Sequence, residues 1–384
     1  FTSPHISSVL ERIQYNGEFL DPVFAKSILQ KILDLNEQGK IDVSFFDAIT
    51  LMMFAYFQQK NVDIAVIEVG CGGLLDSTNI INPLLSIVTS IGLDHMAILG
   101  NTKKEIAANK SGIMKLNTPC VLGYDTEPRE VFVEKSKELN CDLTIVNKNS
   151  FKDFDEENSE IARTSLKVLR EQYDEYIFKG RLTDKIIEEG VLAKQPCRME
   201  DVLSKIGPKI VESINPELRK WTTQNSGKDL KIFLDVGHNA MGIEKVFERI
   251  RKEFPSYYVR VVCGFSSNKD LNDIMKVLLS KSNKIYFSTA DHVRLTDHNG
   301  YIEKVKFFRE KYMHSASRQG RSNDTEMLDV RNIGTVGDMI TKALKEVKHE
   351  KELVIVLGSF FIMKDARLTL GYNDFIDPFI IQEK

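Results

Sequence analysis

Residues 62–113 read VDIAVIEVGCGGLLDSTNIINPLLSIVTSIGLDHMAILGNTKKEIAANKSGI, and this stretch decides the fold. The apolar, β-branched run Val62–Val69 carries Glu68 near its end, and a glycine-rich turn follows it. A second apolar run, Leu84–Ile91, is followed closely by His95. We expect both runs to be strands that, as parallel neighbours, deliver Glu68 and His95 to one edge of a sheet. A carboxylate and an imidazole that meet there can share a divalent metal ion.

Each of these two side chains also has a purely structural explanation. A carboxylate at the end of a strand that should be buried needs a partner, and the backbone amides of a turn can serve as well as a metal ion. A lone histidine is more often a hydrogen-bonded structural residue than a ligand. Both interpretations stay open for Glu68 and His95 at this point.

A helix that carries Lys110 comes next. Thr102 and Glu105 have the spacing of a capping box at its start. Lys110 lies among small residues, so we expect its amine to be partly buried, which disfavours the charged form and makes the amine nucleophilic. The alternative is a lysine at a helix C-terminus that only interacts with the helix dipole, and the sequence alone favours that alternative.

The composition is that of a globular protein that acts on small molecules. The chain is 42% hydrophobic and 28% charged. Its length of 384 residues predicts two or more domains, and its net charge of −3 does not suggest a nucleic-acid-binding surface. No apolar run reaches the ~20 residues of a membrane span. Five scattered cysteines without a CxxC pair argue for a reducing compartment. We expect a cytoplasmic monomer without nucleic-acid or membrane partners, and a mitochondrial location stays open because the chain begins with Phe1.

Strands that alternate with helices predict an α/β fold with mostly parallel sheets flanked by helices. Capped helices that start at Pro22 and Phe45 precede the central stretch, and the alternation returns at Lys231 after a polar segment rich in prolines. We therefore predict a first domain over residues 1–194, a linker with an insertion over 195–230, and a C-terminal domain over 231–384.

Three further segments are ambiguous. Gly70–Gly73 permits close approach to a ligand or merely a tight turn, and its spacing is not that of a dinucleotide fingerprint. Asp235–Asn239 follows the first strand of the second domain, where either ligand contacts or an Asx-type turn is expected. Gly358–Ser359 after the last strand has the same two explanations. The visible sequence contains no phosphate-cradling P-loop, no serine nucleophile elbow and no HExxH.

Taken together, these pieces resemble the folylpolyglutamate synthase/dihydrofolate synthase family, ATP-dependent ligases of the Mur-ligase superfamily. The matching segments, in the family's order, are Phe1–His5, Glu68–Asn79, Thr89–His95, Lys110–Ile113, Asp235–Asn239 and Lys269–Asp270. The resemblance implies a Mur-ligase-like central domain and a Rossmann-like C-terminal domain. It also implies an enzyme that adds L-glutamate to the terminal carboxylate of a pteroate or folate through an acyl phosphate.

The resemblance implies the cofactors and substrates, which are Mg²⁺, ATP, L-glutamate and a pteroate or folate, with a monovalent cation as an additional candidate. It assigns Lys110, as a carbamylated lysine, and His238 to catalysis, and Ser3, Glu68 and His95 to magnesium. The implied ATP contacts are Asn158, Arg198 and Asp235. The implied substrate contacts are Ser44, Phe45, Phe46, Asp47, Leu75, Asp76 and Ser77 for the pterin and Ser359 for glutamate.

The family's P-loop lies just before the segment Phe1–His5, where this chain begins, so we interpret the chain as a fragment of a longer protein. The alternative is a non-catalytic folate- or nucleotide-binding protein of the same fold that never had the loop. A third hypothesis, a metal-dependent hydrolase, rests on Glu68 and His95 alone and predicts activity without ATP.

Overall fold

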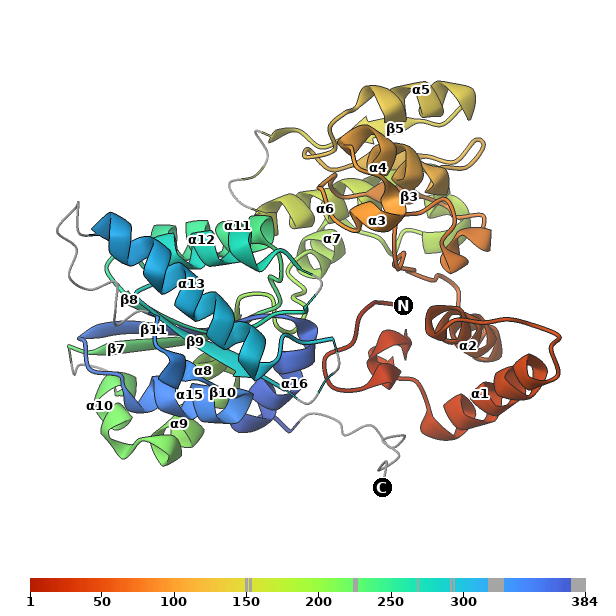
Figure 1. Ribbon diagram of the computed structural model, residues 1–384. Helices are drawn as coiled ribbons and strands as arrows, with labels where there is room; N and C mark the ends of the chain where they lie inside the picture. Colours follow the sequence, from red (N-terminus) through yellow and green to blue (C-terminus); the bar gives the residue numbers. More distant parts are fainter. Residues whose placement is uncertain are drawn as a thin grey trace. The chain divides into compact units, whose positions relative to one another are not determined.

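The structure is a computed structural model that describes residues 1–148, 151, 154–223, 227–267, 269–290, 292, 294–316 and 328–373. The chain divides into two compact units, Phe1–Ala193 and Lys194–Ile376, and the predicted domain that ends at 384 extends beyond the described residues. Both units combine helices with a parallel sheet, so the predicted α/β class is confirmed (Figure 1). Within the described residues, no helix is both long and apolar enough to cross a membrane.

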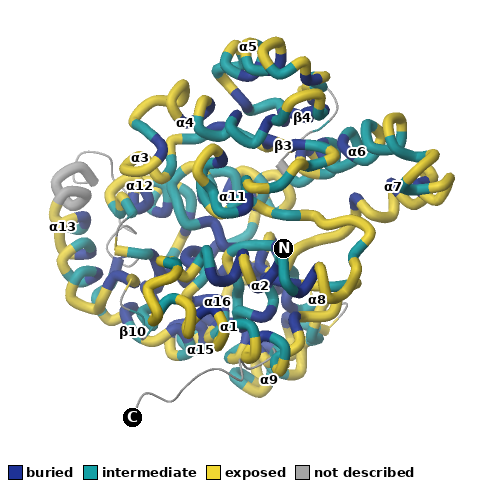
Figure 2. Tube along the Cα trace, turned by 90° about the vertical axis from the view of Figure 1, so that its right-hand side faces the viewer, coloured by how far each residue is buried: buried dark blue, intermediate teal, exposed yellow. Residues whose placement is uncertain are grey.

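The first unit has two hydrophobic cores. One is built by residues 1–20 with helices α1 and α2, and the other surrounds the three-stranded parallel sheet β3-β4-β5. Most of α1 is exposed, whereas α2 buries one face (Figure 2). The helices are α1 (Pro22–Glu37), α2 (Phe45–Lys60), α3 (Met96–Leu99), α4 (Lys103–Lys110), α5 (Glu130–Glu138), α6 (Phe154–Tyr173) and α7 (Asp184–Gly190). The strands are β1 (Gln14–Tyr15), β2 (Glu18–Phe19), β3 (Ser86–Val88), β4 (Cys120–Leu122) and β5 (Leu143–Ile145).

The predicted helix starts in this unit are confirmed by their caps. Asp21 accepts a hydrogen bond from the Phe24 backbone N–H and thereby caps α1. Helices α2 and α4 each start with a capping box, at Ser44 and Thr102. In each box the side chain of the N-cap residue accepts a hydrogen bond from the N3 backbone N–H, and the N3 side chain accepts one from the N-cap backbone N–H. Local side-chain chemistry is enough to determine these starts, because each partner lies three residues away.

The strand predicted at Val62–Val69 is wrong. This segment is not part of a sheet, and Val66 is 82% exposed. Its backbone makes two hydrogen bonds with Phe1. The terminal amine of Phe1 donates to the Val66 carbonyl at 2.8 Å, and the Phe1 carbonyl accepts from Glu68 N at 3.0 Å. An apolar pattern predicts an extended segment, but a strand also requires a partner strand, which the pattern does not specify.

The second unit is organised around a six-stranded sheet with the order β10-β9-β8-β11-β7-β6, in which only β6 is antiparallel to its neighbour. Its strands are β6 (Glu200–Asp201), β7 (Asp229–Asp235), β8 (Tyr258–Gly264), β9 (Lys284–Thr289), β10 (Ile333–Thr335) and β11 (Lys351–Gly358). Its helices are α8 (Val202–Ile206), α9 (Lys209–Ile214), α10 (Arg219–Thr222), α11 (Ala240–Glu253), α12 (Leu271–Lys281), α13 (His298–Ala316), α15 (Val336–Lys345) and α16 (Phe360–Thr369).

Helices cover both faces of this sheet. Alternate strand residues such as Val259, Val261 and Cys263 form one core with α11, α12 and α13, while α15 packs on β8 and β9 from the other face (Figure 1). Because the strands are covered on both sides, they are apolar almost throughout. The central position of β11, between β7 and β8, brings the carboxyl ends of these three strands together.

Residues 195–230, which the sequence analysis assigned to a linker and insertion, contain folded elements of the second unit. Strand β6 pairs with β7, and α8 and α10 contact β7. The side chain of Trp221 is 8% exposed, and its Nε1 donates to the His349 carbonyl at 2.8 Å. Prolines and polar residues made this stretch resemble a linker, but its few apolar side chains are enough to pack it onto the sheet edge.

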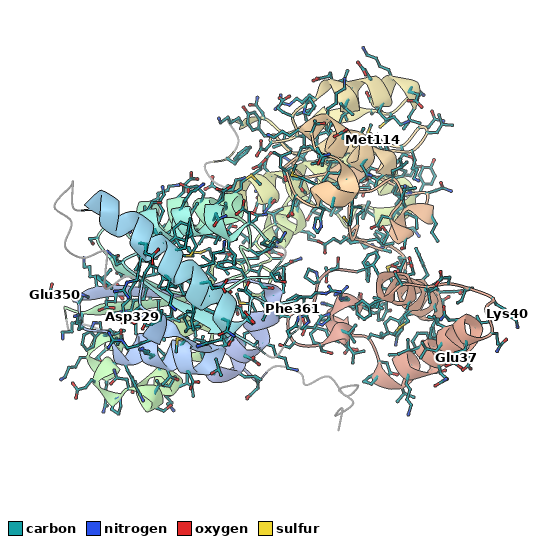
Figure 3. The ribbon with its side chains drawn as sticks, in the orientation of Figure 1. Glu37, Lys40, Met114, Asp329, Glu350 and Phe361 are labelled. Atoms are coloured by element: carbon teal, nitrogen blue, oxygen red, sulfur yellow. The ribbon has the colours of Figure 1, made fainter. Side chains whose placement is uncertain are left out.

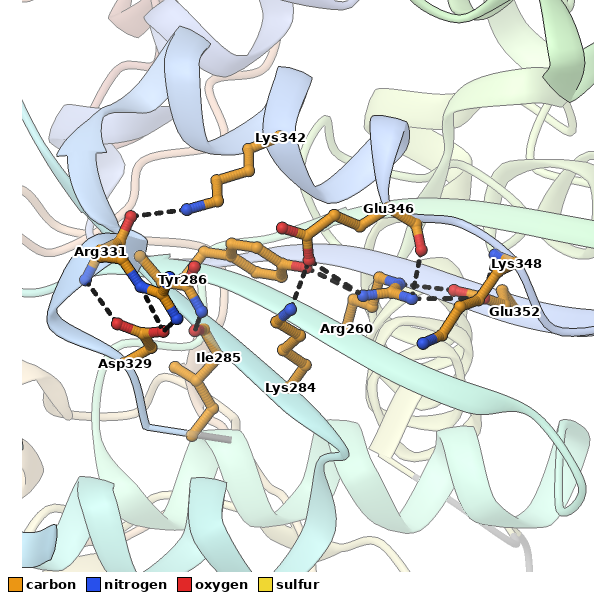
Figure 4. Close-up of polar contacts among 11 residues, drawn as sticks. Arg260, Lys284, Ile285, Tyr286, Asp329, Arg331, Lys342, Glu346, Lys348 and Glu352 are labelled. Carbon is orange, nitrogen blue, oxygen red and sulfur yellow. Dashed lines mark hydrogen bonds and ion pairs between the residues drawn. The ribbon is translucent and has the colours of Figure 1, made fainter. Parts of the chain in front are cut away.

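The amino-terminal halves of the central strands are joined by a buried polar network (Figure 4). Arg260 Nε donates to Glu352 Oε2 at 2.5 Å, and the two side chains are 1% and 0% exposed. Arg260 also donates to Tyr286 Oη at 2.9 Å, and that hydroxyl donates to Glu346 Oε2 at 2.7 Å. Each buried charge therefore has a charged partner and further hydrogen bonds, which is the condition for keeping such a pair inside a protein.

We predict that Arg260→Met lowers the free energy of unfolding of the second unit by about 3–5 kcal/mol, because Glu352 would keep a buried and unpaired charge. Urea unfolding followed by the fluorescence of Trp221, the chain's single tryptophan, measures this unit directly. Arg331→Met is the matched control, since Arg331 pairs with Asp329 but is 83% exposed and should change stability little. Equal destabilisation by both variants would contradict the prediction.

Candidate functional site

Ser3 and Glu68, two of the predicted metal ligands, lie next to each other in the first unit. The backbone N–H of Ser3 donates to Glu68 Oε2 at 2.8 Å, within the same short pairing that joins Phe1 to residues 66–68. The sequence predicted that the Glu68 carboxylate would end a buried strand, but Glu68 is exposed because the segment before it does not enter a sheet.

His95, the third predicted ligand, lies exposed at the start of α3 with a left-handed backbone (φ 52°). Strand β3 ends at Val88, so the sheet edge does not deliver His95 as the sequence predicted. Within the described residues, no group of three His, Cys, Asp or Glu side chains is placed to hold a metal ion by itself. Magnesium commonly takes only one or two protein carboxylates together with water and substrate phosphates, so the oxygen donors of Ser3 and Glu68 fit this ion.

Arg12 belongs to the same site and was missed by the sequence analysis. Burial lowers the pKa of its guanidinium, and the nearby carboxylates of Glu68 and Glu11 act in the opposite direction. Arg12 Nε donates to His5 Nδ1 at 3.0 Å, which places a positive charge beside the segment that carries Ser3. The sequence does contain a capping box before a short helix that ends on Arg12. That pattern predicts the helix, but it does not indicate that Arg12 lies near Glu68.

Lys110 ends helix α4 and is half-buried, as the small residues around it predicted. Burial lowers the pKa of the Lys110 amine, while the Cys71 thiol and the Asp94 carboxylate lie near enough to oppose that shift. Burial also raises the pKa of Cys71, with a contribution from the carboxylate of Asp76. A lysine with a lowered pKa has a larger neutral fraction, which is the form that attacks an electrophile.

The glycine-rich turn after Glu68 packs against the end of α4. A Cβ atom at Gly72 (φ 72°) would collide with the Asn109 side chain, and one at Gly73 would lie 3.0 Å from the Lys110 carbonyl oxygen. The backbone N–H of Leu74 donates to the Asn109 carbonyl at 2.9 Å. The glycines therefore permit close approach of the turn to the helix that carries Lys110.

Asp76 holds this turn together. Its Oδ2 accepts hydrogen bonds from the backbone N–H groups of Gly70 at 3.0 Å and Cys71 at 2.9 Å. Its Oδ1 accepts from the Thr78 backbone N–H at 3.0 Å and from the Thr78 hydroxyl at 2.5 Å. The sequence analysis assigned Asp76 to the substrate, and the structure gives its carboxylate four hydrogen bonds within its own turn.

The two segments predicted to line the pterin site meet through Asp47. This carboxylate accepts hydrogen bonds from the Ser44 backbone N–H at 2.9 Å, from the Ser44 hydroxyl at 2.6 Å and from the Ser77 hydroxyl. The Ser44 and Ser77 hydroxyl groups hold the pKa of Asp47 below its usual value. Asp47 therefore keeps a negative charge well below neutral pH.

Apolar side chains adjoin this polar junction. Phe45 is 62% exposed and Leu75 is 89% exposed, while the Phe46 ring packs against Phe1 with a centroid distance of 5.9 Å. The guanidinium of Arg12 lies 5.3 Å from the centre of the Phe45 ring. Exposed apolar side chains beside a carboxylate and hydroxyl groups are suited to a flat heterocycle that also carries polar atoms.

In the second unit, Asp235 is buried, and both of its carboxylate oxygens accept backbone N–H groups. Oδ2 accepts from Met199 at 2.8 Å, and Oδ1 accepts from Gly237 at 2.7 Å, which is the Asx-type turn that the sequence left open. Arg198 precedes Met199 and is exposed, so two of the predicted ATP contacts lie close together. Asn158, the third, lies exposed on α6 of the first unit.

His238 and Ser359 follow the neighbouring parallel strands β7 and β11 at their carboxyl ends, where ligands bind in open α/β sheets. His238 Nδ1 lies 2.9 Å from the Val236 carbonyl oxygen. Since a carbonyl only accepts, Nδ1 carries a proton, and Nε2 of the neutral ring carries the lone pair. Ser359 caps α16, and its hydroxyl oxygen accepts from the Phe361 backbone N–H at 3.4 Å.

Comparisons with known proteins agree on one family. Residues 23–183 match the Mur ligase middle domain. A dihydrofolate synthase/folylpolyglutamate synthase of Bacillus subtilis is 28% identical over 96% of this chain and 83% of its own length. A folylpolyglutamate synthase of Mycobacterium tuberculosis complexed with ADP has a TM-score of 0.72 at 20% identity, covering 97% of this chain and 84% of that one. A bifunctional folylpolyglutamate synthase/dihydrofolate synthase of Yersinia pestis complexed with AMPPNP and a manganese ion has a TM-score of 0.69 at 21% identity, covering 97% and 82%.

We predict that Asp76→Ala loosens the turn over residues 70–78, because four donors lose their shared acceptor. Amide hydrogen exchange at Gly70, Cys71 and Thr78 should accelerate about tenfold or more. Thr78→Val removes only the hydroxyl donor and is the matched control, with a small effect at Gly70 and Cys71. Unchanged exchange in Asp76→Ala would show that the turn does not depend on this carboxylate.

Proposed function

Because this chain belongs to the folylpolyglutamate synthase/dihydrofolate synthase family of Mur ligases, we propose that it joins L-glutamate to the terminal carboxylate of a pteroate or folate with ATP as the energy source. The observation that carries this proposal is the match to a relative of that name over nearly the whole chain, since it spans both units. The two segments that meet at Asp47 support a pterin as the acceptor.

The reaction has two chemical steps. A carboxylate oxygen of the pteroate or folate attacks the γ-phosphorus of ATP, the bond to the bridging oxygen breaks, and ADP leaves. The amine nitrogen of glutamate then attacks the carbonyl carbon of the acyl phosphate, a proton leaves the nitrogen, and phosphate departs with the electrons of the C–O bond. We assign the ATP phosphates and the pterin to the first unit and glutamate to the second.

The protein uses a nucleotide and a divalent metal ion, and Mg²⁺ is the ion that we propose. Ser3 and Glu68 would hold it, with His95 as a further ligand, and a monovalent cation is an additional candidate. A bound divalent ion supplies positive charge that offsets the charge of the transferred phosphoryl group. Arg12 adds a positive charge near Glu68.

Lys110 is the residue that we propose to be carbamylated. Its neutral amine attacks carbon dioxide, an N–C bond forms, and a proton leaves, so that a cation becomes an anion. Two observations support this assignment, namely the burial that lowers the pKa of Lys110 and the glycine turn that packs against the backbone of its helix. A carbamate at this position would extend the set of oxygen donors available to a metal ion.

His238 is the residue that we propose to accept the proton from the glutamate amine. The hydrogen bond from Nδ1 to the Val236 carbonyl fixes the tautomer and leaves the Nε2 lone pair as the basic site. Ser359 would donate its hydroxyl hydrogen to the same substrate. The exposed side chains of Phe45 and Leu75, with the carboxylate of Asp47, would contact the pterin, while Arg198, Asn158 and the turn held by Asp235 would contact ATP.

We predict that phosphate release from ATP requires both a pterin acceptor, either dihydropteroate or tetrahydrofolate, and L-glutamate. Glu68→Ala should lower kcat at least 100-fold, because the metal ion loses its carboxylate. Glu37, labelled in Figure 3, is an exposed carboxylate at the end of α1, so Glu37→Ala is the control and should keep full activity. Binding of a pterin without any phosphate release would instead indicate the non-catalytic alternative.

We predict that Lys110 takes up ¹³C-labelled bicarbonate as a carbamate, detected by ¹³C NMR. Because burial lowers the pKa of Lys110, the neutral amine and hence the carbamate should appear at a lower pH than for an ordinary lysine, and the signal should grow as pH rises. Lys110→Arg should abolish both signal and activity, whereas the exposed Lys103→Arg should change neither. A signal that persists in Lys110→Arg would reject the assignment.

A further inference from the structure

The segments that follow β8 and β11 lie side by side. Gly358 is paired with Gly264 in the sheet, and Ser359 N donates to the Gly264 carbonyl at 2.8 Å. Gly358 has φ 135°, and a Cβ atom there would collide with the Gly264 carbonyl oxygen. Glycine at this position therefore lets the segment after β11 lie directly beside the segment after β8.

This approach brings two serine hydroxyl groups together. Ser266 Oγ lies 3.3 Å from Ser359 Oγ, and Ser359 is buried while Ser266 is half-buried. Backbone contacts hold Ser266 in place, since it bridges Leu295 and its carbonyl accepts from Lys269 N at 3.1 Å. The sequence analysis singled out Ser359 but not Ser266.

The pair of hydroxyl groups lies at the positive end of a helix. Ser359 caps α16, a helix of ten residues, and the labelled Phe361 in Figure 3 marks its first turn. The first backbone N–H groups of a helix and the helix dipole both favour an anionic group. In this structure one of the two hydroxyl groups donates to the other. When a carboxylate binds, each hydroxyl can rotate and donate to one of the two carboxylate oxygens.

We infer that Ser266, together with Ser359, binds the side-chain carboxylate of the incoming glutamate and selects an amino acid that carries one. This inference rests on the proposed function and deepens it, because it names a residue that recognises the side-chain carboxylate of the substrate. Ser266 is thus a specificity-determining residue rather than a participant in bond making.

The order of the strands explains why the side-chain carboxylate, and not the α-carboxylate, reaches Ser266. His238 follows β7, Ser359 follows β11 and Ser266 follows β8, so His238 and Ser266 are separated by two strand spacings, or about 10 Å. An α-carboxylate is attached to the same carbon as the amine and would stay near His238. The side-chain carboxylate lies at the far end of the molecule, so it extends toward the two serines. The His238 ring lies beside the first residue of α16, since its centroid is 6.2 Å from that of the Phe360 ring.

The test compares Ser266→Ala with Ser267→Ala in the whole protein. The control serine is exposed, one residue further along, and its hydroxyl bonds only the Arg294 carbonyl among the contacts described. We expect Ser266→Ala to raise KM for L-glutamate about tenfold with little change in kcat, since one charge-assisted hydrogen bond is lost. The inhibition constant of L-glutamine, which lacks the side-chain charge, should change far less. Ser266→Thr, which keeps a hydroxyl group, should restore most of the affinity for glutamate.

Two results would overturn the inference. An unchanged KM for glutamate in Ser266→Ala would remove Ser266 from the site, and equal weakening of glutamate and glutamine would place the α-carboxylate there instead. Melting temperatures of the variants separate either result from a loss of folding. Wild-type protein whose phosphate release does not depend on glutamate would reject the proposed function itself, and this assignment with it.

Discussion

The candidate site of the first unit depends on the hydrogen bonds that the Asp76 carboxylate accepts. A tight turn leaves backbone N–H groups without partners inside the chain, and an aspartate within the turn is one way to satisfy several of them at once. By accepting from Gly70, Cys71 and Thr78, Asp76 fixes the turn that packs against the end of α4. The surroundings of Lys110 therefore depend on a residue that does not bond its amine. The glycine turn and the helix that carries Lys110 are joined here through backbone contacts.

The second unit uses the same solution at the end of β7. Asp235 satisfies one N–H in its own turn and a second in the turn before β6, which binds the two segments to each other. The latter turn contains Cys197 and Met199, both with positive φ, a conformation that side-chain-bearing residues rarely adopt. Such a backbone conformation persists only where surrounding contacts stabilise it. The hydrogen bond from the Met199 backbone N–H to Asp235 is one of these contacts.

The two ends of the second sheet have different roles. Near the amino ends of its central strands, Arg260 and Glu352 form a buried pair whose hydrogen bonds are made within the protein, so the loss of either partner would leave an unpaired buried charge. At the carboxyl ends, Gly264 and Gly358 let the following segments come together, and the hydroxyl groups of Ser266 and Ser359 meet there. Loops at this edge can vary without disturbing the core, which is why α/β sheets place binding residues there.

The sequence by itself determined the features whose causes are local. Caps at Ser44 and Thr102 and the alternation of strands and helices follow from residues a few positions apart. Tertiary structure decided the rest, because a strand exists only with a partner and a site only with its neighbours. The tertiary structure left residues 62–69 outside any sheet, brought Arg12 near Glu68 and placed Ser266 beside Ser359. These residues are far apart in the chain, and no local sequence pattern specifies contacts over such separations.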